Sequence, residues 1–282
     1  MHRPHLPQIR KRRLNSMAPE EINVIIQGGL QFRDFTLKAA EDYARLDFVT
    51  KVVISTWEDE ELDETHVQSP KIVILKNTKP VNPGPGNMNL QLRSSLEGVK
   101  LCHDGLIMKT RSDQHLFEPS FRKWMAFFQQ HKNEKVLKYR DGTEQKSKIF
   151  LIGNNKVHPF HPQDHFLWGY KQDLVRLLDA PEWDVPAWTW RDAPVDFTVK
   201  LRPPIYFGMH YYRQFYAGVE KFMHDEKKYL LDGAPQYSEA MDFYTPIRDS
   251  IFRVFPRIDL RWEKYNSGYW YSYEAGGEYY AD

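Results

Sequence analysis

Two spacings of hydrophobic positions alternate along the first 180 residues. Short continuous apolar runs such as INVII and KVVIS are typical of strands that are buried on both faces. Between them, in DFTLKAAEDYARLDF for example, apolar residues recur at helical spacing, which favours a helix with one buried face. The pattern predicts strands over residues 22–30, 51–57, 71–76, 105–110 and 146–153, and helices over 34–48, 89–102, 120–131 and 168–179.

The order of these elements predicts an α/β fold. Helices alternate with buried strands, so we expect a mixed, mostly parallel central sheet flanked by helices. Residues 180–204 are rich in Pro and Trp and predict an irregular connection. Beyond them we expect an aromatic-rich helical C-terminal region, with a helix over 212–231, a helix over 238–255 that is broken near Pro246, and a strand pair or an ordered tail over 265–282.

Composition narrows the class of protein. The 282 residues carry a net charge of +1, which argues against a nucleic-acid partner. Cys102 is the one cysteine, so an internal disulfide and a zinc site built from several cysteines are excluded. Its apolar neighbours favour a buried, inert thiol. The aromatic content of 15% supplies core volume, and also flat rings on which a nucleobase or a sugar could stack.

No stretch of ~18 consecutive apolar residues is present, so no transmembrane helix is expected. Residues 1–20 are basic but lack the apolar segment of a secretory signal, and we interpret them as a disordered leader. A cytoplasmic location follows. Peripheral membrane contact would require Lys11, Arg12 and Arg13 of this leader to touch anionic lipid headgroups.

The carboxyl ends of the strands are where we expect a ligand, because open α/β sheets bind ligands there. The chain reads QGG after the first strand, STWEDEE after the second and KTRSD after the fourth. In the last segment, Asp113 could hold a divalent cation against a diphosphate, and Lys109 and Arg111 could pair with the phosphates. The alternative is a strand end with a capping Asp and a local ion pair.

Four segments carry a resemblance to a known family: VVISTWEDE, NMNLQLRSSLEGV, LIMKTRSD and HPFHPQDHFLWG, in this order. Over residues 22–178 the chain resembles the WavE family of lipopolysaccharide-synthesis proteins. The resemblance implies a GT-A-like (Rossmann-like) glycosyltransferase that uses a nucleotide-diphosphate sugar. Residues 21–180 would bind this donor, and residues 181–282 would form the acceptor side of the same domain. Rings such as Trp188, Trp190 and Trp270 would help to shape that side.

By this resemblance, Asp113 is the carboxylate of a degenerate DXD motif. The usual form has two acids separated by one residue, whereas RSD offers Arg111 and Asp113. A shifted reading, Asp113-Gln114-His115, offers Asp113 and His115 as ligands for Mn²⁺ or Mg²⁺, and His suits Mn²⁺ better. Alternatively, Lys109 and Arg111 supply the positive charge to the diphosphate themselves.

Three other segments are expected to contact the nucleotide sugar. The loop after the first strand would pass under the nucleoside, the end of the second strand would contact the base or ribose, and the helix after the Pro/Gly loop would offer its N-terminus to phosphate. Each has a structural alternative: a turn, a core tryptophan and a helix cap. The residues are Gln27, Gly28 and Gly29, then Thr56, Trp57 and Glu58, then Asn87, Asn89 and Gln91.

We expect a general base in HPFHPQDHFLWG. In an inverting transferase a side chain must take the proton of the acceptor hydroxyl, and Asp164 is our first candidate, with His165 second. The alternative is that Asp164 caps the following helix. The three histidines of this segment have the composition of a zinc site, but its two prolines spoil a helical presentation of all three.

These expectations favour transfer of a hexosyl or similar sugar from a nucleotide-diphosphate donor to a glycan or lipid-linked acceptor, in surface-polysaccharide or lipopolysaccharide-type synthesis. One alternative is a sugar nucleotidyltransferase, but the loop QGGLQFRD is short for it and offers only Arg33. Another is a non-catalytic glycan-binding or scaffold protein of the same fold. A methyltransferase fits less well, because QGG lacks the fuller Gly pattern of a dinucleotide-like loop.

Overall fold

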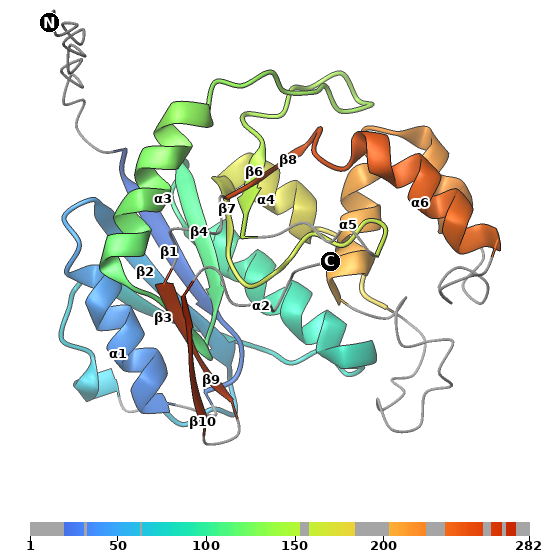
Figure 1. The fold of residues 1–282 in the computed structure, drawn as a ribbon. Coiled ribbons are helices and arrows are strands. Elements are labelled where there is room, and N and C mark those ends of the chain that lie inside the picture. The colour runs from blue at the N-terminus through green and yellow to red at the C-terminus, as the bar shows by residue number, and fades with distance from the viewer. Residues whose placement is uncertain are drawn as a thin grey trace, which may run out of the picture.

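A computed structural model describes residues 20–30, 33–62, 64–152, 158–183, 203–223, 235–255, 261–266 and 269–274. Its centre is a seven-stranded sheet in the order β3-β2-β1-β4-β7-β6-β8 (Figure 1). Neighbouring strands are parallel, except that β7 runs antiparallel to both β4 and β6. The strands are β1 (Ile22–Gln27), β2 (Val49–Trp57), β3 (Ile72–Asn77), β4 (Leu106–Arg111), β6 (Ile149–Leu151), β7 (Leu167–Tyr170) and β8 (Phe252–Val254).

Helices cover both faces of this sheet. Because side chains alternate across a strand, Val24 and Ile26 of β1 pack into one core with α1 and α3, whereas Ile25 belongs to a second core with α2, α4 and α5. The arrangement confirms the predicted mixed, mostly parallel α/β class. The helices are α1 (Arg33–Ala44), α2 (Met88–Leu101), α3 (Glu118–His131), α4 (Lys171–Leu178), α5 (Pro203–Tyr212) and α6 (Pro235–Ile247), with short 3-10 turns η1 (Glu64–His66), η2 (Pro85–Asn87) and η4 (Ala217–Phe222).

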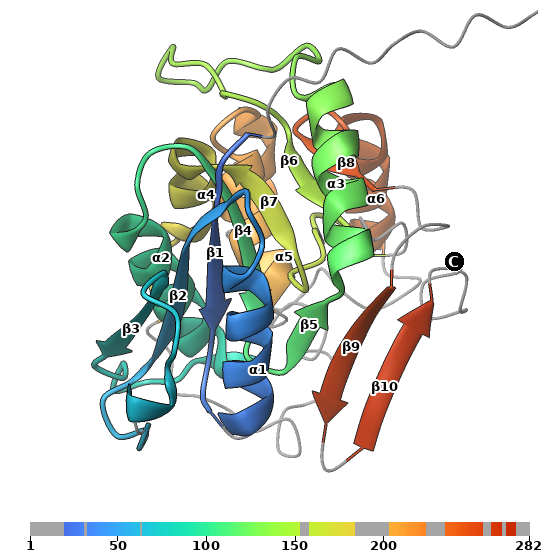
Figure 2. The ribbon, with the colours of Figure 1, turned by 90° about the vertical axis from the view of Figure 1, so that its left-hand side faces the viewer.

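A second, three-stranded sheet lies beside α1 and α3 (Figure 2). The short strand β5 (Gln114–Leu116) follows β4 and pairs antiparallel with β9 (Arg261–Asn266), which pairs antiparallel with β10 (Tyr269–Glu274). The strand-pair interpretation of the aromatic last segment is therefore confirmed. Trp270 lies in β10, whereas Trp188 and Trp190 fall outside the described residues.

Three predicted helices differ from the structure in their bounds. The helix expected over 168–179 starts only at Lys171, because residues 167–170 form β7 between β4 and β6. Of the helix expected over 212–231, residues 212–223 hold only the end of α5, at Tyr212, and η4, and residues 224–231 lie outside the described residues. The helix expected over 238–255 ends at Ile247, in agreement with the predicted break near Pro246, and residues 252–254 pair with β6. The apolar runs at residues 167–170 and 252–254 could form either a helix or a strand by their local pattern. Pairing with distant strands makes both of them extended.

Helix α2 lies unusually close to the sheet, and this closeness positions its first turns. A Cβ atom on Gly98 would lie 2.8 Å from Cγ2 of Ile25, so only glycine permits this approach. The hydroxyl of Ser55 donates to the Ser94 carbonyl at 2.7 Å, which ties α2 to β2. The N-terminal half of α2 is thereby held against the carboxyl ends of the central strands.

Cys102 is buried at the end of α2, as predicted. Burial raises the pKa of its thiol to about 12, so the reactive thiolate is absent near neutral pH. No helix in the described ranges combines the length and the apolar character needed to cross a membrane.

Candidate functional site

Four segments meet at one edge of the main sheet. Strands β1, β2 and β4 are parallel, so Gln27, Trp57 and Arg111 all lie at the carboxyl edge. Strand β7 runs the other way, and Leu167 pairs with Lys109 near the end of β4. The segment before β7, with Asp164 and His165, therefore reaches the same edge from the opposite direction. Two regions that the sequence predicted separately are brought together.

A buried pair of opposite charges forms the floor of this edge. Lys109 is completely buried and its Nζ donates to the backbone carbonyl of Asp164 at 2.9 Å. Asp164 is 8% exposed, and its carboxylate accepts a hydrogen bond from the side-chain amide of Gln91 on α2. Gln91, Lys109 and Asp164 come from a helix, a strand and a loop, so tertiary structure alone assembles them.

The pKa values of this pair reflect competing effects. Burial by itself would raise the pKa of Asp164, but Lys109, His165 and Arg111, with the hydrogen bond from Gln91, hold that pKa well below its usual range. Burial lowers the pKa of Lys109 to about 8 against the attraction of Asp164, which leaves the ammonium mostly protonated at pH 7. The edge thus carries a buried cation and a buried anion at neutral pH.

Arg111 and Asp113 pair with each other across the turn that ends β4. Nε of Arg111 lies 2.9 Å from Oδ1 of Asp113, and Nη2 lies 3.0 Å from Oδ2. A guanidinium binds phosphate in the same bidentate geometry, with two parallel hydrogen bonds. Both side chains are partly exposed, at 34% and 15%, so they are within reach of a ligand. The local ion pair that the sequence offered as an alternative is present.

Gln114, which sequence reasoning did not single out, contacts His165. Its side-chain Nε2 lies 2.5 Å from Nδ1 of His165, and Gln114 is fully buried. His165 is only partly buried and is more accessible than Asp164 beside it. Gln114 therefore fixes the orientation of the His165 ring, and the Nε2 atom of His165 points away from the Gln114 amide. A glutamine between two candidate ligands gave no sequence signal of this role.

The loop after β1 is tightly packed around Ser112. Gly28 has a φ of 120°, and a Cβ atom there would lie 3.0 Å from Oγ of Ser112. Oγ of Ser112 donates to the Gly29 carbonyl at 2.7 Å, and the Ser112 amide donates to the Gln27 carbonyl at 2.9 Å. The side chain of Gln27 accepts from Ser94 on α2 at 2.8 Å. The loop lies directly beside the turn that carries Arg111 and Asp113.

The end of β2 lies next to this loop. Thr56 is fully buried and its carbonyl accepts from the side chain of Asn77 at 2.8 Å. Trp57 is 3% exposed, and a Cβ atom on Gly29 would lie 3.9 Å from its indole ring. Glu58 is exposed and accepts from the hydroxyl of Thr78 at 2.7 Å. Of these three predicted contacts, Glu58 is the one with an exposed side chain.

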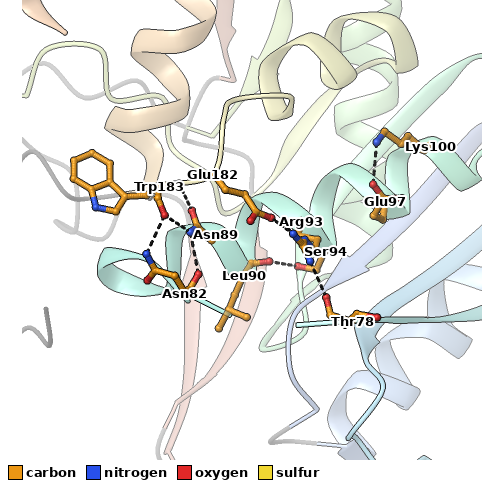
Figure 3. A network of polar contacts seen from close by, with 10 residues as sticks. All are labelled: Thr78, Asn82, Asn89, Leu90, Arg93, Ser94, Glu97, Lys100, Glu182 and Trp183. Atoms are coloured by element: carbon orange, nitrogen blue, oxygen red, sulfur yellow. Dashed lines mark hydrogen bonds and ion pairs between the residues drawn. The ribbon is translucent and has the colours of Figure 1, made fainter. Parts of the chain in front are cut away.

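Three polar residues at the start of α2 have different roles. Asn87 has a left-handed backbone, with φ 62°, and its side chain makes no capping hydrogen bond. Asn89 instead binds the backbone of Trp183: its Oδ1 accepts from the amide at 2.7 Å and its Nδ2 donates to the carbonyl at 2.8 Å (Figure 3). Gln91 alone turns toward Asp164. Asn89 thus holds the segment after α4, and Gln91 belongs to the candidate site.

His115 points away from this cluster toward α1. Its ring packs against Tyr43 and Phe117, with centroids 5.3 Å away in both cases, and Nε2 lies 3.8 Å from Oδ2 of Asp42. In the described part of the chain, no group of three His, Cys, Asp or Glu side chains could hold a metal ion. With the carboxylate of Asp113 held by Arg111, the residues present do not fit a cation bound by protein groups alone.

We predict that His115 makes the fold sensitive to acid. Burial lowers the pKa of His115 to about 4, against the attraction of Asp42, whereas an unfolded histidine titrates near 6.5. Between pH 6.5 and 4 the unfolded chain takes up a proton that the folded chain refuses, so stability falls as the pH falls through this window. Of the free energy of unfolding lost between pH 7 and pH 5, about 2 kcal/mol should come from His115.

Chemical denaturation of a His115→Phe variant at pH 7 and pH 5 checks this prediction. Phenylalanine keeps the aromatic contacts and removes the titrating group, so the variant should lose less stability at pH 5 than the wild type. His103→Gln, at an exposed position, serves as the control. An unchanged acid sensitivity of the His115 variant would show that another group is responsible.

An open, mostly parallel α/β sheet that gathers charged side chains at its carboxyl edge has the arrangement in which α/β folds bind ligands. The chain belongs to the WavE lipopolysaccharide synthesis family, whose family model matches residues 22–200. The fold is the mixed, mostly parallel α/β sheet flanked by helices that the sequence predicted.

Solved structures resemble the chain only distantly. Staphylococcus aureus TarS 1–349 shares 12% identity over 69% of this chain and 56% of that chain, with a TM-score of 0.41. HddC from Yersinia pseudotuberculosis shares 12% over 72% and 99%, with a TM-score of 0.35. The apo-form glycosyltransferase GlyE of Streptococcus pneumoniae TIGR4 shares 7% over 85% and 55%, with a TM-score of 0.39. The chain spans 56% of the TarS fragment, and no likeness of this degree assigns it a substrate.

No curated protein sequence matches the chain.

Proposed function

We propose that the protein is a glycosyltransferase that moves a sugar from a nucleotide-diphosphate donor to a glycan or lipid-linked acceptor in surface-polysaccharide synthesis. The observation that carries this proposal is the meeting of Lys109, Arg111, Asp113 and Asp164 at the carboxyl edge of the sheet. Membership of a lipopolysaccharide synthesis family supports the acceptor class. We assign the donor to residues 21–180 and the acceptor side to residues 181–282.

Arg111 is the proposed ligand of the donor diphosphate. Its guanidinium pairs with Asp113 at two bonds, and a diphosphate offers the same geometry with more charge. Lys109 lies too deep for direct contact, so it acts through its field and through its bond to the Asp164 backbone. Positive charge held in a buried setting stabilises a leaving diphosphate without reorganisation. Mn²⁺ or Mg²⁺, if used, would be held by Asp113 together with donor phosphates.

His165 is a better candidate than Asp164 for the general base that takes the proton of the acceptor hydroxyl. The pKa of Asp164 is held low by its cationic neighbours, which makes its carboxylate a weak base. His165 is more accessible, and Gln114 orients its ring. Rotation of the Gln114 amide exchanges its oxygen and nitrogen, so the Gln114 oxygen can accept a hydrogen bond from Nδ1–H of His165. In that tautomer, the Nε2 atom of His165 is the one that takes the proton of the acceptor hydroxyl. Asp164 then stabilises the imidazolium that forms.

Isothermal titration with UDP, GDP and dTDP, each with and without Mn²⁺, tests the proposed function. UDP-GlcNAc, the ligand named in one of the TarS structures, is a suitable first donor. Binding of one of these nucleotides is expected, and the absence of binding by every nucleotide would contradict the proposal.

Arg111→Ala is expected to weaken nucleotide binding by roughly 10- to 100-fold, the usual loss for charge-assisted hydrogen bonds worth about 1.5–3 kcal/mol. The same titration measures it. Arg122→Ala is a matched control, because Arg122 pairs with Glu118 on the surface of α3 and lies outside the candidate site. Equal affinities in the Arg111 variant and the wild type would remove Arg111 from the donor site.

A further inference from the structure

A second concentration of positive charge lies on a different part of the molecule. A cavity of about 310 Å³ is lined by Arg140, Arg176 and Arg213, together with Tyr139, Asp141 and Glu220. We call it the arginine cavity. Its arginines come from three separate segments: the turn between Lys138 and Glu144, the last turn of α4, and the residue after α5.

The arginine cavity lies toward the opposite edge of the sheet from the candidate donor site. The segment with Arg140 leads into β6, which is parallel to β4 and begins at the amino edge. The long connection between α3 and β6 lies at the end of the sheet where β1 begins (Figure 1). A ligand in this cavity would therefore not compete with a nucleotide at Arg111.

Arg176 is held rigidly in the cavity wall. Its guanidinium carbon lies 4.0 Å from the centre of the Tyr139 ring, which is buried. Nη2 donates to Oδ2 of Asp141 at 2.8 Å and to Oγ1 of Thr143 at 2.9 Å. The backbone carbonyl of Arg176 accepts from the side chain of Gln214 at 2.9 Å. An arginine fixed from several sides has little rotamer freedom left to lose when it binds an anion.

The other two arginines keep unused donors. Nη1 of Arg140 forms an ion pair with Oε1 of Glu220 at 2.5 Å. The backbone amide of Arg140 donates to the Gln214 carbonyl at 2.7 Å. Among the described residues, no carboxylate lies within ion-pair distance of Arg213. A guanidinium has five N–H donors. The three arginines are positively charged and Asp141 and Glu220 are negatively charged, so the lining has a net charge of +1.

We propose that the arginine cavity binds the phosphomonoester group of a sugar phosphate. A carboxylate is planar and is satisfied by one guanidinium, whereas a phosphate offers oxygens in several directions and suits donors that converge from separate segments. The cavity is at the lower end of the size range for small-molecule sites, and it exceeds what a lone phosphate fills. Because the cavity lies away from the candidate donor site, its ligand would be a phosphorylated effector of the chain and not the acceptor.

Calorimetric titration of the full chain with glucose 6-phosphate, inorganic phosphate, glucuronate and glucose tests the proposal. Glucose 6-phosphate should bind one to one, at least tenfold more tightly than inorganic phosphate or glucuronate, and glucose should not bind. Arg213→Gln and Arg176→Gln should each weaken binding at least tenfold. Arg45→Gln, at an exposed position paired with Asp42, should leave it unchanged.

Two controls separate this site from the donor site. Saturating UDP should not displace glucose 6-phosphate, and Arg111→Ala should bind it as the wild type does. Circular dichroism verifies that the Arg213 and Arg176 variants are folded. The proposal is overturned if no sugar phosphate binds, if inorganic phosphate binds as tightly as the ester, or if folded Arg213→Gln and Arg176→Gln bind like the wild type.

Discussion

Replacing Lys109 with methionine is expected to cost roughly 3 kcal/mol of the free energy of unfolding and to abolish detectable nucleotide binding. Lys109 is completely buried, and Asp164 is nearly so. Without the ammonium group, the Asp164 carboxylate stays in a low-dielectric environment with less positive charge to offset its burial. Urea denaturation measures the stability loss, and calorimetry measures nucleotide affinity.

A double-mutant cycle makes this prediction specific. Lys109→Met with Asp164→Asn removes both charges, so the double variant should be more stable than the sum of the single losses predicts. Lys100→Met is the control for loss of a lysine as such, because Lys100 is exposed and pairs with Glu97 on the surface of α2. Strictly additive losses would show that Lys109 and Asp164 do not interact.

Gly208→Ala is expected to destabilise the protein by at least about 3 kcal/mol and to disturb the candidate site. A Cβ atom at this position of α5 would lie 2.1 Å from the backbone oxygen of Phe160 and 2.6 Å from Cδ of Pro162. The clash involves backbone, so the loop that carries Asp164 and His165 has to move. Within a helix, alanine normally stabilises a protein by about 1 kcal/mol relative to glycine. A loss of stability in Gly208→Ala would therefore report the clash and not helix propensity.

Gly218→Ala provides the comparison. A Cβ atom there would meet the ring of Phe243 at 2.8 Å, and a side chain can yield where backbone cannot. Chemical denaturation should therefore show a much smaller loss for Gly218→Ala than for Gly208→Ala. A Gly208→Ala variant that is as stable as the wild type would mean that α5 and the loop are further apart than described.

The first four strands were predictable because each is a continuous apolar run bounded by polar or glycine-containing segments. Strand β7 was not, because the apolar residues of LWGYKQDLVRLL fit a helix throughout, and only pairing with β4 and β6 makes the first four extended. Helix α5 is apolar on all sides, PPIYFGMHYY, so it has no helical periodicity to detect.

The candidate site was predictable to the extent that it lies at strand ends. Arg111 and Asp113 follow β4 directly, and their position follows from the sheet rule alone. Asp164 joins them because β7 is antiparallel, which the sequence did not reveal. The hydrogen bond from Gln91 and the contact of Gln114 with His165 depend on how α2 and β5 pack, and no spacing along the chain encodes that.

A crystal structure of the protein with UDP and Mn²⁺ would show directly where the diphosphate binds. We predict the diphosphate at the carboxyl edge of the sheet, with a phosphate oxygen within hydrogen-bond distance of the Arg111 guanidinium and Asp164 beneath it. A diphosphate bound elsewhere, with the pair between Arg111 and Asp113 untouched, would contradict this prediction.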